Sequence, residues 1–341
     1  MGGGYWNLGR IPRDRYLEIE AALRVFLDET FGNENYRIPR YYGAKVDFGD
    51  VDILLSSKVT EGSDWDEVKK LIIEGLGIKR HGSISSRVFS IVYHGFQVDF
   101  FRESHEHMLT KTNYMGFNDL GNLIGRLFRP LGLKYGERGL FFVFRRKTGN
   151  YTKVILVSAD WEKILTLVGL DYGAWVRGFH EIEEMFEWII ASPYFRSTPY
   201  ISRKSKVIRK GAKMRPTIQK FLQYIEERNI RCDQPFYLDE DEGIALIERH
   251  FPELRLKQQI NDEQKKEKEA TVLYAKYNGR LAMEWVPQLG GKSLGDMMSQ
   301  FTQMYSPEEL LMMEPAVVRA SFIKLHEEKQ PETKWRASKS H

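Results

Sequence analysis

The stretch Tyr41–Ser57, "YYGAKVDFGDVDILLSS", places two carboxylates inside a run that otherwise predicts a buried strand. Residues two apart on a strand lie on the same face, so Asp50 and Asp52 point together while Val51 and Ile53 point toward the core. An unpaired buried charge costs several kcal/mol. The pair therefore indicates either a positively charged group close to this strand face or a face that is exposed to solvent.

A third acid follows on a later strand. The stretch "SRVFSIVYHGFQVDFFRES" predicts a β-hairpin that turns at His94-Gly95 and carries Asp99 on its return strand. If that strand neighbours the first, Asp50, Asp52 and Asp99 converge, and three crowded carboxylates repel one another. Divalent cations would relieve this repulsion. The sequence therefore predicts a site for a pair of Mg²⁺ ions, with Mn²⁺ as an alternative, and with open positions for phosphate oxygens.

Two residues upstream extend this prediction. A Gly-led turn at Gly43 can present backbone N–H groups to a phosphate, and Lys45 can neutralise its charge. The alternative is structural: Gly49 and Asp50 form an ordinary turn, and Asp52 is a solvent-facing strand residue.

The flanking elements predict an α+β fold. A helix is expected over Arg13–Phe31, strands over 36–55, and a further helix from Ser63. A second hairpin is expected to turn at residues 148–150. After Ser158 the strand signals fade and amphipathic helices follow.

This order of elements resembles the polymerase-beta-like nucleotidyltransferases. Their signature is a helix, a Gly-Gly or Gly-Ser turn, a strand with Asp-x-Asp, and a third Asp on a neighbouring strand. The corresponding residues here are Gly43-Ala44, Asp50 and Asp52, and Asp99. Ala44 stands where the family usually has Ser or Gly.

Two further segments resemble the palm of the family X DNA polymerases, "GNLIGRLFRPLGLKYGERGLFF" and "WEKILTLVGLDYGAW". The resemblance spans about residues 13–175. The family's sugar-contacting Tyr-Phe-Thr-Gly motif is absent from the sequence, which argues against an ordinary gap-filling DNA polymerase.

The resemblance implies a mixed-sheet nucleotidyltransferase palm followed by an all-helical domain. It implies a Mg²⁺-dependent transfer of a nucleoside monophosphate from an NTP, ATP among them, to a hydroxyl. Asp50 and Asp52 would hold both ions, and Asp99 would complete the site that activates the acceptor. The expected triphosphate contacts are Gly43, Ala44 and Lys45.

The second half of the chain points to an RNA acceptor. The segment "KYNGRLAMEWVPQLGGKSLGDMMSQF" is similar to one in the helical body of CCA-adding enzymes and bacterial poly(A) polymerases, and Gly290-Gly291 could hold a phosphate. A dense basic stretch could follow a phosphate backbone. Its cationic residues include Arg203, Lys204, Lys206, Arg209 and Lys210.

The expected domains are a catalytic domain over 1–158, a helical substrate-binding domain over 159–328 and a disordered tail over 329–341. The formal net charge of +4 permits a polyanionic partner without requiring one. The single cysteine, Cys232, excludes a disulfide within the chain and suits a reducing compartment. No membrane span is indicated. We expect a soluble cytoplasmic protein, or one of the host cytoplasm if the gene is viral, and the sequence indicates no oligomeric state.

Three alternatives remain at this point. The acceptor could be a protein or a small molecule, and nucleic acid would then be dispensable for pyrophosphate release. The chain could be a family X-like DNA polymerase, which requires template-dependent extension. It could also be a non-catalytic nucleic-acid-binding protein, whose binding would tolerate loss of Asp50 and Asp52.

Overall fold

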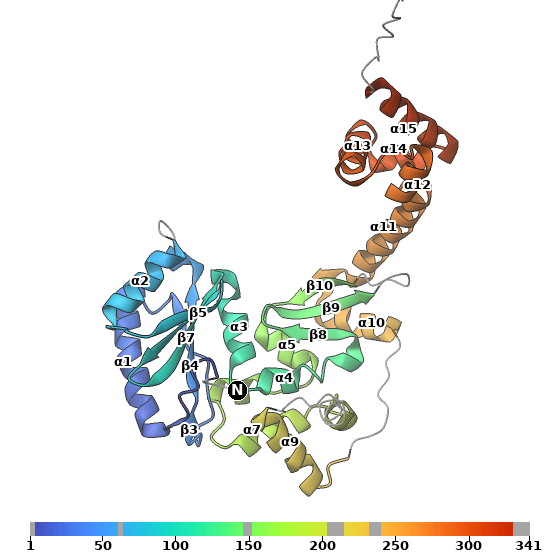
Figure 1. Ribbon diagram of the computed structural model, residues 1–341. Helices are drawn as coiled ribbons and strands as arrows, with labels where there is room; N and C mark the ends of the chain where they lie inside the picture. The colour runs from blue at the N-terminus through green and yellow to red at the C-terminus, as the bar shows by residue number, and fades with distance from the viewer. Residues whose placement is uncertain (1–3, 61–63, 146–151, 203–214, 232–239, 330–341) are drawn as a thin grey trace, which may run out of the picture. The chain divides into compact units, whose positions relative to one another are not determined.

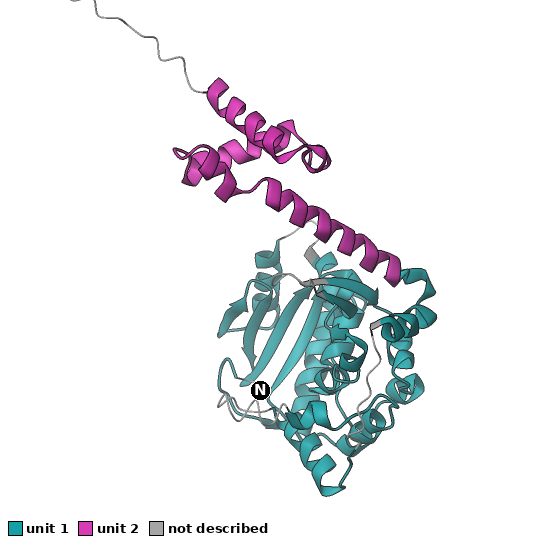
Figure 2. Cartoon of the chain, turned by 90° about the vertical axis from the view of Figure 1, so that its right-hand side faces the viewer, with its two compact units in different colours: residues 1–145, 151–255 teal, residues 146–150, 256–341 magenta. Residues whose placement is uncertain are grey.

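The computed structural model describes residues 4–60, 64–145, 152–202, 215–231 and 240–329 (Figure 1). The chain divides into two compact units, which Figure 2 colours separately. The first comprises residues 1–145 and 151–255, and the second comprises residues 146–150 and 256–341. The boundary expected at residues 158/159 therefore lies inside the first unit.

The first unit is built on a mixed sheet, which confirms the α+β expectation. Among the described residues this sheet has five strands in the order β2-β4-β7-β6-β5. The central strand β7 runs parallel to β4 and antiparallel to β6. The strands are β2 (Tyr36–Arg37), β4 (Asp50–Ser56), β5 (His81–Ser85), β6 (Val88–Tyr93) and β7 (Phe96–Glu103).

Two helices pack on one face of this sheet (Figure 1). The helix α1 (Arg13–Phe31) has the predicted bounds and ends at Gly32, whose φ of 80° favours glycine. The helix α2 (Trp65–Gly75) begins after Asp64, whose carboxylate accepts two backbone N–H groups of the first turn. Their apolar sides bury alternate residues of the strands, among them Val51, Ile53, Leu55, Val98 and Phe100.

The turn between β6 and β7 is the predicted one. His94 and Gly95 both have positive φ, 48° and 77°, as a two-residue hairpin turn of this twist requires. The turn aligns Ser90 of β6 with Asp99 of β7. The helix α3 (Met108–Met115) lies on the side of the sheet opposite α1 and α2 (Figure 1).

The rest of the first unit contains two smaller sheets and several helices. The pairs β1 (Ile11–Pro12) with β3 (Asp47–Phe48) and β9 (Gly139–Arg145) with β10 (Thr152–Ser158) are antiparallel. The second pair was expected; its turn at 148–150 lies outside the described residues. The remaining elements are β8 (Leu133–Gly136), α4 (Leu120–Ile124), α5 (Trp161–Leu167), α6 (Tyr172–Arg177), α7 (Ile182–Ile190), α9 (Pro216–Glu227) and α10 (Glu240–His250), with short 3-10 helices at Ser57–Thr60, His105–His107, Arg129–Leu131 and Pro252–Leu254.

The described part of the second unit is helical, as expected for the C-terminal region. Its core gathers aromatic side chains around Phe301 and Phe322, both fully buried. Every helix among the described residues is too short or too polar to cross a bilayer. The helices of this unit are α11 (Leu256–Lys276), α12 (Gly279–Trp285), α13 (Gly291–Met304), α14 (Pro307–Met312) and α15 (Pro315–Lys329).

Candidate active site

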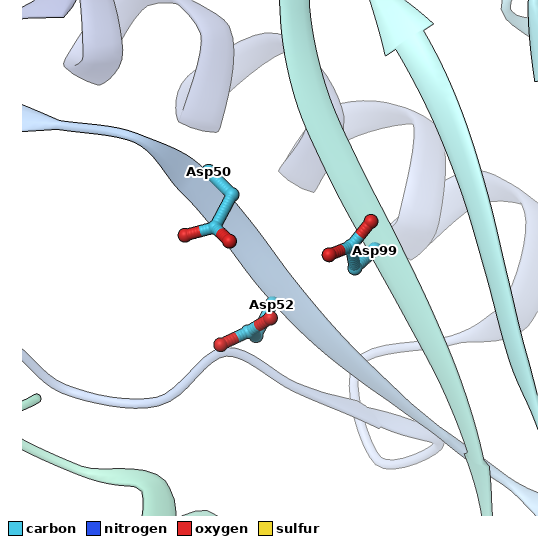
Figure 3. A group of neighbouring side chains, drawn as sticks. All are labelled: Asp50, Asp52 and Asp99. Carbon is cyan, nitrogen blue, oxygen red and sulfur yellow. The ribbon is translucent and has the colours of Figure 1, made fainter. Parts of the chain in front are cut away.

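Asp50, Asp52 and Asp99 lie together on one face of the central sheet (Figure 3). In the parallel pairing of β4 with β7, Asp52 is aligned with Asp99 and Asp50 with Gln97. One carboxylate oxygen from each aspartate lies within 4.8 Å of the other two. The sequence expectation that the three acids converge is therefore met, and the alternative of a turn and a solvent-facing strand residue is not.

The alternation of β4 and β7 explains why these acids share a face. Val51 and Ile53 point into the core beneath α1 and α2. Their neighbours Asp50 and Asp52 consequently point to the other side. The same alternation in β7 places Asp99 on the face of the sheet that is opposite to the face of Val98, which is fully buried.

The electrostatics of the cluster favour a cation. Burial raises the pKa of Asp52 well above its ordinary value, and the nearby charges of Asp50 and Asp99 raise it further. Burial also raises the pKa of Asp99. The three side chains offer only hard oxygen donors, which Mg²⁺ and Mn²⁺ prefer. The residues therefore fit a divalent ion, whose charge would let all three carboxylates ionise together.

Asp99 is held by two hydrogen bonds from its own sheet. The Ser90 hydroxyl donates to Oδ1 at 2.5 Å, and the Gln97 side-chain amide donates to Oδ2 at 2.8 Å. Both partners are buried, and both bonds oppose the effect of burial on the pKa of Asp99. The third carboxylate thus has a fixed orientation before any ligand binds.

Lys45 lies near the acids, as the sequence suggests. Its ammonium donates to the Asn118 side-chain oxygen at 3.0 Å and lies 4.1 Å from the centre of the Phe48 ring. Burial lowers the pKa of Lys45 to about 8, while the charges of Asp50 and Asp52 act to raise it. A cation at this depth suits an anionic ligand.

Gly43 and Ala44 are placed differently from the expectation. Their backbone N–H groups donate to the carbonyl oxygens of Phe179 and His180, at 2.8 and 2.7 Å. They are therefore engaged with protein, and a phosphate would have to displace these bonds. A side chain at position 43 would crowd His180, because a Cβ atom there would lie 2.4 Å from Nδ1 of the exposed His180 ring, which would have to move.

A cavity of about 740 Å³ adjoins the acids, with Asp50, Asp52 and Lys45 in its wall. This volume lies in the range of small-molecule sites. Its lining includes four further basic residues, Arg10, Arg40, Arg215 and Lys220. The cavity thus joins an acidic end to a cationic wall.

These other cations have different engagements. Arg10 donates to the Asp47 carboxylate at 2.8 Å, and Arg215 donates to Asp119 at 2.5 Å. Lys220 is exposed at the second turn of α9. No local sequence pattern singles out these three, since they reach the cavity only through tertiary packing.

Several predicted residues are not brought to this site. The basic stretch with Arg203, Lys204, Lys206, Arg209 and Lys210 lies outside the described residues, as does Cys232. Gly290 is the N-cap of α13 in the second unit and Gly291 is its first residue; the Ser293 side chain accepts the Gly290 N–H at 3.2 Å.

Comparison with known proteins gives one kind of match. No protein-family model and no curated protein matches the chain. Among solved structures, a crystal structure of Leishmania infantum polymerase beta in a ternary gap complex is similar, with 15% sequence identity and a TM-score of 0.33. The match covers 42% of this chain and 55% of that one, so it spans about half of each.

Proposed function

We propose that this protein is a nucleotidyltransferase that moves a nucleoside monophosphate from an NTP to a hydroxyl and releases pyrophosphate. The observation that carries the proposal is the placement of Asp50, Asp52 and Lys45 in the wall of one cavity, with Asp99 directly beside the first two. A triphosphate needs a divalent ion at one end and a cation along its length, and this cavity offers residues for both.

The reaction balances with the groups present. The acceptor oxygen forms a bond to the α-phosphorus, the bond from that phosphorus to the bridging oxygen breaks, and pyrophosphate leaves with the electron pair. The hydroxyl proton passes to a carboxylate oxygen or to water. When bound, Mg²⁺ screens the phosphate charge and makes a hydroxyl easier to deprotonate.

The chain's own residues divide the remaining work. Asp50 and Asp52 would hold the ions, and Asp99, which Ser90 and Gln97 orient, would complete the acceptor side. Lys45 would contact the triphosphate from its position over the Phe48 ring.

The proposed acceptor is the 3′ end of a nucleic acid, with RNA ahead of DNA and addition without a template. The basic stretch over 200–216 and the C-terminal similarity to CCA-adding enzymes support this acceptor. Both of these observations about the acceptor come from the sequence.

An extension assay tests the proposal. The protein is incubated with Mg²⁺, each labelled NTP or dNTP in turn, and 5′-labelled RNA, tRNA or DNA with and without a template. Asp52→Asn should abolish transfer. Asp64→Asn is the matched control, because Asp64 caps α2 on the other side of the sheet and asparagine also caps helices well.

Each result is decisive for one part of the proposal. RNA that lengthens only with intact Asp52 supports both the reaction and the acceptor. Label on protein or on a small molecule keeps the reaction and overturns the acceptor. Template-dependent growth of DNA assigns a DNA polymerase. If neither Mg²⁺ nor Mn²⁺ supports transfer, the hypothesis of an enzyme fails. The alternative of a non-catalytic nucleic-acid-binding protein is then favoured.

A further inference from the structure

The N-terminal segment contacts both residues that hold Asp99. The indole Nε1 of Trp6 donates to the Ser90 hydroxyl oxygen at 2.9 Å. The backbone N–H of Trp6 donates to the Gln97 side-chain oxygen at 3.2 Å. Trp6 thus touches both partners of the third carboxylate without touching the carboxylate itself.

These two hydrogen bonds from Trp6 set the direction of the hydrogen bonds that Ser90 and Gln97 make with Asp99. An indole N–H can only donate, so the Ser90 oxygen accepts it and the single Ser90 proton is left for Asp99. Likewise, the Gln97 oxygen is turned toward Trp6, which turns its NH₂ group toward Asp99. Both oxygens of Asp99 therefore receive a donor.

Trp6 is itself held in place. The Arg80 guanidinium lies 4.6 Å from the centre of its ring, and the Tyr5 ring packs edge-on against it at 4.7 Å. A few residues on, Ile11 pairs with Phe48 in the β1–β3 ladder. The segment between them contributes Asn7, Gly9 and Arg10 to the lining of the cavity.

We propose that Trp6 is a positioning residue of this active site: it fixes Ser90 and Gln97 as donors and so keeps Asp99 aligned opposite Asp52. The N-terminal segment is on this account a part of the catalytic centre. The inference rests on the proposed function for its kinetic consequence and on the hydrogen bonds alone for its structural one.

The first test is ion binding by the full-length protein. Trp6→Phe keeps an aromatic ring beside Arg80 and removes the indole N–H together with part of the ring. Mn²⁺ binding, followed by electron paramagnetic resonance, should weaken about 10-fold or more, as when a residue behind a metal ligand is lost. Gln97→Leu, which adds no charge and cannot donate to Asp99, should weaken it as well.

Trp65→Phe provides the matched control. Trp65 is buried on the α2 side of the same sheet, and its indole Nε1 has no hydrogen-bond partner among the described residues. This variant loses the same atoms and some packing, so it should lose stability and keep its Mn²⁺ affinity. Unchanged Mn²⁺ affinity in a folded Trp6→Phe protein would overturn the proposal.

A crystal structure of metal-free Trp6→Phe decides the point without any ion or reaction. Changed side-chain rotamers of Ser90 and Asp99 support the positioning role. Rotamers and hydrogen bonds identical to those of the parent overturn it, whether or not the protein transfers nucleotides.

Kinetics then separate positioning from nucleotide binding. In an active protein, Trp6→Phe should lower kcat and leave the KM for NTP nearly unchanged, because Lys45 is untouched. A raised KM with an unchanged kcat would instead place Trp6 in nucleotide binding and contradict the proposed role.

Discussion

Asp52 and Asp99 are register partners on adjacent parallel strands, although a 3-10 helix, the helix α2 and the strands β5 and β6 separate them in the chain. The pairing brings two carboxylates face to face on one side of the sheet, and Asp50 joins them from the same strand. Because burial and the charges of Asp50 and Asp99 raise the pKa of Asp52, the charge state of the cluster should be coupled to the stability of the protein.

The first prediction concerns the metal-free protein. The pKa of Asp52 is raised well above 3.8, so above that pH the folded state binds more protons than the unfolded state. The free energy of unfolding should therefore fall as the pH rises from about 4 toward the raised pKa. Thermal or urea unfolding in EDTA at several pH values measures this slope.

Mg²⁺ should restore the lost stability at neutral pH. An ion at 100 times its dissociation constant adds about 2.7 kcal/mol. Asp52→Asn should flatten the pH slope in EDTA and remove most of the gain from Mg²⁺, while Asp64→Asn should behave as the parent does. A slope that Asp52→Asn leaves unchanged would show that other groups cause it.

The second prediction concerns Lys45 and nucleotide affinity. Because the pKa of Lys45 is lowered to about 8, the free protein loses this ammonium above that pH, and the KM for NTP should rise there. Lys45→Met should raise the KM about 10- to 100-fold at pH 7, the value of one charged hydrogen bond. Lys45→Met should also abolish the rise in the KM for NTP near pH 8.

The matched control is Lys69→Met, since Lys69 pairs with Asp66 on the surface of α2. The contribution of Lys45 to stability changes with pH in the opposite direction to its contribution to NTP binding. The unfolded chain binds more protons between pH 8 and 10.5, so the Lys45 contribution to folding improves as the pH rises through this window. A KM profile that is the same in Lys45→Met would exclude the lysine as the titrating group.

The third prediction concerns Gly43. In Gly43→Ala the new Cβ would lie 2.4 Å from the His180 ring, so the variant should lose about 1–3 kcal/mol of unfolding free energy. His180→Ala in the same protein should recover much of that loss. Gly136→Ala is the control, because a Cβ there meets no atom within 4 Å. Equal stability of the Gly43 and Gly136 variants in urea would refute the close contact.

The fourth prediction concerns the basic stretch of the sequence. Reversing Lys204, Lys206 and Arg209 to glutamate should weaken binding to single-stranded RNA. Because each phosphate contact contributes about 0.7 to the salt slope, the slope should fall by about 2. Fluorescence anisotropy at several salt concentrations measures it. The same change in charge at Lys69, Lys70 and Lys79 should alter the slope much less; equal effects would argue against a specific track.

The acid cluster could be predicted from the sequence because strand alternation is local. The period of two in β4 and β7 fixes the faces of Asp50, Asp52 and Asp99, and the His94-Gly95 turn fixes the hairpin that carries Asp99. That the two strands are neighbours was an assumption, which the structure confirms; their parallel orientation was not predicted.

The rest of the site depends on tertiary packing. Trp6 and Arg215 lie far from the motif in the chain, and no periodicity links them to it. Gly43 shows the opposite problem: the sequence suggests a phosphate turn, whereas the folded chain uses both N–H groups of the turn for contacts with Phe179 and His180. The division at residue 256 is similarly non-local, because the helices after Ser158 look alike in sequence on either side of it.

The two backbone bonds from Gly43 and Ala44 have a mechanical consequence. They fasten the loop that carries Lys45 to residues immediately before α7. The backbone just before Lys45 is therefore tied to the start of α7. A displacement of this loop would have to carry the residues before α7 with it or break both hydrogen bonds.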